Sequence, residues 1–143
     1  MDNPSKITEG GVEYSLGKFD GKCVLYDFPK ILIYLNAKGK LLFGKKFKIY
    51  EEDKDILLKL CSYFIKDKEN CTKYEIDIDK GILLSGPVGC GKTSLMKLLK
   101  HLVPLQRPYL IAPCRNIVFG FNHLGYKIIE DYGDSSPICF DDL

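Results

Sequence analysis

The chain has 143 residues, of which 45% are hydrophobic and 28% charged, a composition typical of one globular domain and unlike that of disordered proteins. Its 21 basic and 19 acidic residues give a net charge of +2, which excludes a histone-like protein that coats polyanions by bulk charge. The six cysteines include no C-x-x-C pair, and the chain shows neither a signal-peptide pattern nor an apolar run of membrane-spanning length. These features predict a cytoplasmic protein with no zinc site and no membrane partner.

The first 50 residues are predicted to form an arm and a helix. Residues 1–21 are polar and rich in glycine, which favours a loose arm. From Cys23 to Phe43 the chain is apolar, and its apolar positions follow a helical stripe. A hairpin over Asn36–Gly39 is the competing interpretation. We expect residues 1–50 to be a mainly helical, partner-binding segment that precedes a core over residues 51–143.

Within residues 51–143, helices and strands are predicted to alternate. An amphipathic helix follows Asp53, and a polar connection covers residues 66–73. The apolar run Gly81–Ser85 is typical of a strand buried on both faces of a parallel sheet.

The elements after Gly91 continue this alternation. A helix ended by Pro104 is followed by a strand over Tyr109–Ala112, a long helix over residues 115–132 and a strand over Ile138–Phe140. The order of strand, helix, strand, helix, strand predicts an α/β fold with a parallel sheet flanked by helices.

The segment Gly86–Thr93, with the sequence Gly-Pro-Val-Gly-Cys-Gly-Lys-Thr, matches G-x-x-x-x-G-K-[ST] at every fixed position, between a predicted strand and a predicted helix. Its glycines let successive N–H groups turn inward around phosphate oxygens, and the following helix adds the positive end of its dipole. Lys92 would reach the β- and γ-phosphates of a nucleotide, and the Thr93 hydroxyl would bind Mg²⁺. The alternative is a glycine-rich turn that matches by chance. The predicted nucleotide-binding residues are Gly86, Pro87, Val88, Gly89, Cys90, Gly91, Lys92, Thr93 and Ser94.

A second motif stands at the end of the printed sequence, where the apolar strand Ile138–Phe140 runs into two acids. Asp141 would hold Mg²⁺, and Asp142 stands where a base or a water-orienting carboxylate is needed for catalysis. The alternative is an acidic chain end that only aids solubility.

Together these segments resemble the P-loop ATPases of the DnaC-like helicase-loader and transposition-ATPase group, within the AAA+ class. The resemblance rests on Gly81–Thr93, on Arg115–Tyr132 and on the ending Ile138–Leu143. It implies a P-loop NTPase fold, ATP and Mg²⁺ as ligands, self-association, and a replicative helicase, a transposase or single-stranded DNA as partner. Most AAA+ proteins carry glutamate where this chain has Asp142.

In AAA+ proteins the sensor residue, the arginine finger and the helical lid follow the second motif, and the sensor strand lies between the two motif strands. The resemblance therefore implies that these residues are the first part of a longer ATPase. Two alternatives stay open: a nucleotide-binding module without turnover, and another P-loop enzyme such as a small-molecule kinase or a GTPase. The GTPase alternative needs an Asn-Lys-x-Asp motif, which the sequence lacks.

Four weaker signals remain. The basic stretch Lys38–Lys48 would contact nucleic acid or a partner, or would simply be a solvated face. By analogy with AAA+ proteins, Lys48–Tyr50 would line an adenine pocket. Arg107 and Arg115 would act on phosphate in trans or form ordinary surface pairs, and Cys90 would be an oxidisable switch or an inert loop residue.

Overall fold

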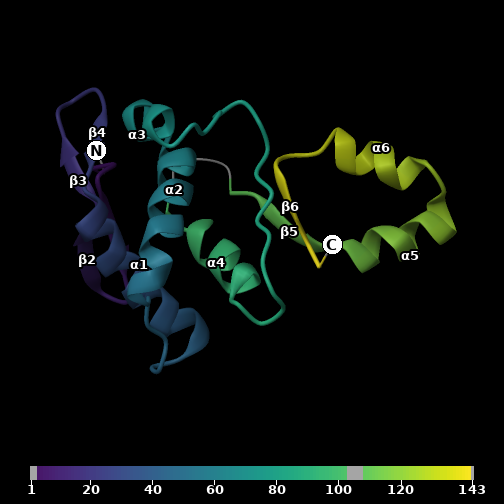
Figure 1. The fold of residues 1–143 in the computed structure, drawn as a ribbon, viewed down its shortest axis with the longest axis horizontal. Coiled ribbons are helices and arrows are strands. Elements are labelled where there is room, and N and C mark those ends of the chain that lie inside the picture. Colours follow the sequence, from purple (N-terminus) through teal and green to yellow (C-terminus); the bar gives the residue numbers. More distant parts are fainter. Residues whose placement is uncertain (1–2, 103–107, 143) are drawn as a thin grey trace. The chain divides into compact units, whose positions relative to one another are not determined.

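A computed structural model describes residues 3–102 and 108–142 and divides the chain into two compact units, Met1–Leu84 and Ser85–Leu143 (Figure 1). The expected boundary at residue 50 falls inside the first unit. The loop Gly86–Thr93 and both acidic residues of the second motif belong to the second unit.

The first unit begins with four short strands. β1 (Lys6–Glu9) pairs with β2 (Val12–Ser15), and β3 (Gly17–Phe19) pairs with β4 (Val24–Tyr26), each pair antiparallel. The prediction of a loose arm is therefore wrong, and the N-terminal segment is not mainly helical.

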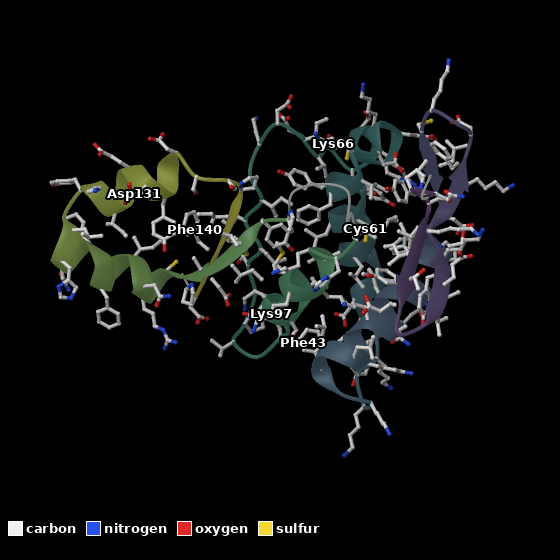
Figure 2. All side chains as sticks on the ribbon, turned by 180° about the vertical axis from the view of Figure 1, so that it is seen from behind. Phe43, Cys61, Lys66, Lys97, Asp131 and Phe140 are labelled. Atoms are coloured by element: carbon white, nitrogen blue, oxygen red, sulfur yellow. The ribbon has the colours of Figure 1, made fainter. Side chains whose placement is uncertain are left out.

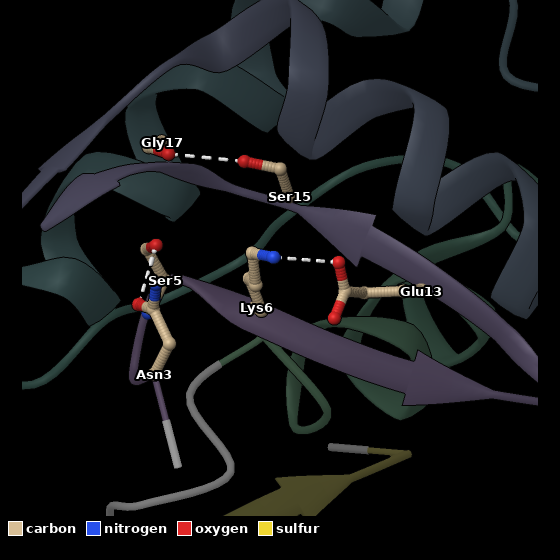
Figure 3. A network of polar contacts seen from close by, with 6 residues as sticks. All are labelled: Asn3, Ser5, Lys6, Glu13, Ser15 and Gly17. Carbon is tan, nitrogen blue, oxygen red and sulfur yellow. Dashed lines mark hydrogen bonds and ion pairs between the residues drawn. The ribbon is translucent and has the colours of Figure 1, made fainter. Parts of the chain in front are cut away.

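The glycines that suggested a loose arm instead make a turn. Gly10 and Gly11 have φ angles of 58° and 79°, the left-handed pair that a tight β-hairpin turn requires. The Lys6 ammonium donates to Glu13 Oε1 across the hairpin at 2.7 Å (Figure 3). A glycine pair between short polar segments was thus a hairpin signal.

The predicted apolar helix is confirmed as α1 (Phe28–Phe43). Asp27 caps it by accepting from the backbone N–H of Lys30 at 3.5 Å, and Pro29 lies in its first turn. The competing hairpin over Asn36–Gly39 is wrong, because these residues lie within the helix. Strand β2 packs along α1, where the ring centroids of Tyr14 and Tyr34 lie 5.6 Å apart.

The rest of the first unit is helical. A short 3-10 turn, η1 (Glu51–Asp53), leads into α2 (Lys54–Ile65), which confirms the second predicted helix. The polar connection contains α3 (Lys68–Lys73), which sequence analysis missed. Its signal was Asp67, whose carboxylate accepts from Asn70 N–H at 3.1 Å in a helix N-cap.

Apolar side chains from α1, α2 and α3 and from the turn between the two hairpins are buried in the first unit. None is more than 5% exposed. They are Leu16, Ile31, Tyr34, Leu35, Leu57, Leu60, Cys61 and Cys71.

The second unit contains the predicted helix α4 (Lys92–Leu99) and the parallel strands β5 (Leu110–Pro113) and β6 (Ile138–Asp141). Both strand predictions are confirmed, and the two strands pair with each other in parallel. Pro104, the expected end of the first of these helices, lies outside the described residues; the helix ends before it, at Leu99.

The single long helix over residues 115–132 is wrong. The structure has α5 (Cys114–Leu124) and α6 (Lys127–Gly133), which fold back on one another (Figure 1). Gly125 separates them with a φ of 62°, and its N–H donates to Phe121 O at 2.8 Å to end α5.

The predicted strand over Gly81–Ser85 is also absent from the described chain. The segment has no hydrogen-bonded partner strand, and Leu83 is 77% exposed. The described residues form one parallel pair and no larger parallel sheet. In the same residues, no helix combines the length and apolarity needed to cross a bilayer.

Candidate functional site

The amino end of α4 presents unused backbone donors. Gly91 precedes the helix with a φ of 88°, and the first helical bond runs from Leu95 N–H to Gly91 O at 2.9 Å. The backbone N–H groups of Lys92, Thr93 and Ser94 donate no hydrogen bond to any acceptor among the described residues. Free N–H groups at a helix start, together with the positive end of the helix dipole, favour an anion.

The loop before α4 needs its glycines. Gly89 has a φ of 80°, in the left-handed region that a Cβ disfavours, as does Gly91. Between them Cys90 N–H donates to Pro87 O at 3.4 Å, which closes a turn. Val88 at the tip of this turn is fully exposed, so the loop is open to a ligand from solvent.

The Lys92 side chain folds back into this loop. Its ammonium donates to Gly86 O at 2.8 Å and to Pro87 O at 2.7 Å, and it lies 3.6 Å from Cys90 Sγ. Lys92 thus holds a full positive charge inside the loop, satisfied by neutral acceptors. An anionic ligand would compete with these two carbonyls for the ammonium, because a hydrogen bond between two charged groups is stronger than one to a neutral acceptor.

The two motifs meet through Thr93 and Asp141. The Thr93 hydroxyl donates to the Asp141 carboxylate, at 2.8 Å from Oδ1 and 3.0 Å from Oδ2. These residues are 48 positions apart in the chain. The helix that begins at the loop and the strand that ends in the acids are therefore joined at their functional ends.

Asp141 lies at the carboxyl end of the parallel strand pair. Pro113, the last residue of β5, is the register partner of Asp141. Two residues earlier on β6, burial and the Asp141 charge raise the pKa of the Cys139 thiol. A raised pKa keeps the Cys139 thiol protonated at neutral pH.

No family model, curated protein or solved structure matches this chain.

The donor set fits magnesium. Thr93 and Asp141 offer a hydroxyl and a carboxylate, the hard oxygen ligands that Mg²⁺ prefers. No cluster of three or more His, Cys, Asp or Glu side chains occurs in the part of the chain that the structure describes. A cation held by so few protein ligands needs further oxygens from phosphate groups, which is the usual arrangement for Mg²⁺ with a nucleotide.

Asp142 stands apart from this network. It is exposed, has a left-handed φ of 58°, and makes no hydrogen bond or ion pair with any other described residue. Such a carboxylate is accessible to a water molecule or a ligand, but no neighbouring side chain orients it.

Among the other sequence candidates, Lys48–Tyr50 belongs to the first unit and Arg115 lies in the first turn of α5. Arg107 lies outside the described residues. Sequence analysis missed Tyr109, whose hydroxyl donates to Met96 O on α4. The signal was a tyrosine at the start of the predicted strand Tyr109–Ala112, because a tyrosine hydroxyl that becomes buried needs a partner.

Proposed function

We propose that this protein binds ATP with Mg²⁺ at the loop Gly86–Thr93. The observation that supports this proposal is the hydrogen bond from Thr93 to Asp141, which joins two motifs far apart in the sequence. A glycine-rich turn that matched the motif by chance would have no reason to meet a strand-terminal carboxylate. Both residues are needed side by side to hold one magnesium ion.

In this proposal the loop and α4 supply the phosphate ligands. The N–H groups of Lys92, Thr93 and Ser94 would donate to phosphate oxygens, and the Lys92 ammonium would exchange its loop carbonyls for them. Thr93 and Asp141 would hold Mg²⁺, which neutralises charge on the phosphates. The contribution of the protein is position and electrostatics, which dominate phosphoryl transfer.

We further propose that the protein hydrolyses ATP. Asp142 would orient water for attack on the γ-phosphate, as the resemblance to AAA+ ATPases implies. The same resemblance implies the biological role of a helicase loader or mobile-element ATPase that self-associates. The exposure of Asp142 and its lack of described partners favour a second candidate, a module that binds nucleotide without turnover.

The test is a calorimetric titration of the full chain with Mg²⁺-ATP, beside Lys92→Ala and a matched control, Lys97→Ala. Lys97 is an exposed lysine of the same helix. We expect Lys92→Ala to weaken binding at least tenfold, since hydrogen bonds to charged groups contribute about 1.5–3 kcal/mol. Lys97→Ala should bind as the wild type does.

A further variant isolates the metal. Asp141→Asn keeps a hydrogen-bond acceptor for Thr93 but removes the charge that a cation requires. Chelation of Mg²⁺ should weaken ATP binding in the wild type and leave Asp141→Asn unaffected. Equal binding by Lys92→Ala and wild type would refute the nucleotide site, and measured turnover by the wild type would reject the binding-only candidate.

A further inference from the structure

A second charged feature lies in the first unit, where α1 ends and the chain turns back. Gly44 N–H donates to Lys40 O at 3.1 Å to end the helix, and Phe47 N–H donates to Gly44 O at 3.0 Å in the turn that follows. Phe43 marks this end of α1 in Figure 2. We call residues 45–50 the return segment.

The return segment is held against α1 at two points. Phe47 packs on Gly39 so closely that a Cβ there would lie 2.0 Å from its ring. Two residues on, Ile49 N–H donates to Asn36 Oδ1 at 3.3 Å. The segment therefore runs back along the helix in a fixed register.

Exposure alternates along this segment as in an extended chain. Phe47 and Ile49 are half-buried, whereas Lys46, Lys48 and Tyr50 are exposed. Every second residue of an extended chain points the same way, about 7 Å from the last. Lys48 and Tyr50 therefore share the outer face, with Lys48 Nζ 4.7 Å from the centre of the Tyr50 ring, and the exposed Lys46 lies in the turn just before them.

The positive charge of this face lies within residues 38–50, and the acids Glu51, Glu52 and Asp53 follow directly, of which Glu51 pairs with Lys54. Five lysines and no carboxylate occur between Lys38 and Tyr50. Lys38 is structural, because it pairs with Glu9 at 2.8 Å and its side chain is only 13% exposed. The others form no ion pair among the described residues, and they are Lys40, Lys45, Lys46 and Lys48.

Aromatic surface accompanies this charge. Tyr50 is 52% exposed and Phe43 is 38% exposed. Beside Lys48, an open hollow of about 300 Å³ has an apolar wall of Leu32, Ile33 and Ile49. Proteins that bind single-stranded nucleic acid combine cations, which contact the phosphate backbone, with aromatic and apolar surface, on which the bases stack.

We propose that the outer face of the return segment, Lys48 and Tyr50 with the neighbouring Lys40, Lys45 and Lys46, binds single-stranded nucleic acid. The lysines would neutralise phosphates, and the Tyr50 ring would stack on an unpaired base. A duplex keeps its bases stacked on one another and would leave Tyr50 without a role. This inference goes beyond the nucleotide site and does not depend on it.

The experiment is fluorescence anisotropy of a labelled oligothymidylate titrated with the full chain over a range of salt. The test variant Lys46→Gln/Lys48→Gln should bind about tenfold more weakly, and its slope of log affinity against log salt should fall by about 1.4, or about 0.7 per lost phosphate contact. Tyr50→Leu should weaken binding about tenfold through lost stacking and leave the salt slope unchanged.

The matched control is Lys18→Gln/Lys22→Gln, which removes the same charge from exposed lysines of the same unit. It should bind like the wild type, and circular dichroism should show that every variant keeps its helices. Addition of Mg²⁺-ATP should leave oligonucleotide binding unchanged, which separates this proposal from the nucleotide site.

Three results would overturn the inference: no binding of the oligonucleotide by the wild type, equal losses in the test and control lysine variants, or an unchanged affinity in Tyr50→Leu. Binding to phosphatidylserine vesicles in the absence of oligonucleotide binding would likewise reject it in favour of an anionic membrane surface.

Discussion

Two pairs of amphipathic helices in this protein differ in whether their apolar faces are buried. In the first unit, the apolar stripes of α1 and α2 are buried, and Leu35 and Leu57 are 0% and 1% exposed. In α5 and α6 of the second unit no residue is buried, and Phe119 and Ile129 are 63% and 52% exposed. The same periodicity therefore predicts a helix in both regions but does not say whether anything covers its apolar face.

Burial of apolar surface is the main source of folding free energy. It is found in the helices of the first unit and also in α4 of the second, where Leu98 and Leu99 are 1% and 0% exposed, but not in α5 and α6. The candidate nucleotide site lies in the second unit and depends on backbone conformation and a few polar bonds. Substitutions in the two units should consequently act through different mechanisms.

The largest expected effect tests burial directly. Leu35→Ala should lower the free energy of unfolding by about 2–5 kcal/mol, because it removes fully buried methyl groups and leaves a cavity. Phe119→Ala deletes a larger side chain from the exposed face of α5 and should change it by less than about 0.5 kcal/mol. Urea denaturation followed by circular dichroism measures both, and similar losses in the two variants would break the comparison.

A smaller effect should follow from backbone conformation in the second unit. Gly91→Ala places a Cβ at a φ of 88° and should cost about 1–2 kcal/mol of strain, seen as weaker Mg²⁺-ATP binding or lower stability. Gly133, at the end of α6, has no left-handed φ and open space around it. Gly133→Ala should therefore be neutral or slightly stabilising in the same urea and calorimetric measurements. If both variants behaved alike, loop conformation would not be what sets the second unit apart.

The smallest effect concerns a thiol in the interior of the first unit. Burial raises the pKa of Cys61 on α2 to about 12, from 9.0 for a free thiol (Figure 2). Above pH 9 the unfolded chain loses this proton while the folded chain keeps it, so folding stability falls as pH rises from about 9 towards 12. The loss from this group is at most about 1.4 kcal/mol per pH unit.

Cys61→Ala should lack this component, so its unfolding free energy should fall less steeply than that of the wild type when urea titrations at pH 8 and pH 10 are compared. Labelling with a thiol reagent gives an independent check, since Cys61 should react only on unfolding whereas the exposed Cys90 should react at once. Rapid labelling of Cys61 in the folded chain would contradict its burial.

The sequence predicted the candidate site better than it predicted the fold around it. Fixed spacing identified Gly86–Thr93 and Asp141, because the chemistry of phosphate and magnesium demands those residue types at those positions. The motifs assigned Thr93 and Asp141 to one magnesium ion, and in the structure the two side chains are in contact. The second motif also predicts that Asp142 orients water, but no described residue bonds to its carboxylate, so that role stays a prediction.

Where local signals had two meanings, the prediction failed. Gly10-Gly11 was interpreted as a break in a loose arm although it is also a hairpin turn, and Gly125 was passed over inside an apolar stripe that it interrupts. The apolar run Gly81–Ser85 has strand-like residues, yet a strand exists only with a hydrogen-bonded neighbour. Such outcomes depend on tertiary partners, which composition and periodicity do not contain.

The hydrogen bond from Tyr109 to Met96 affects how α4 is held. A helix held at one point can change its direction, whereas a helix held at two points along its axis cannot do so without breaking a contact. Helix α4 is held at Thr93 by Asp141 of β6, and at Met96, about 4.5 Å further along its axis, by Tyr109 directly before β5. A ligand that took the Thr93 hydroxyl from Asp141 would break the first contact only, and the Tyr109 bond and the buried Leu98 and Leu99 would still hold the helix.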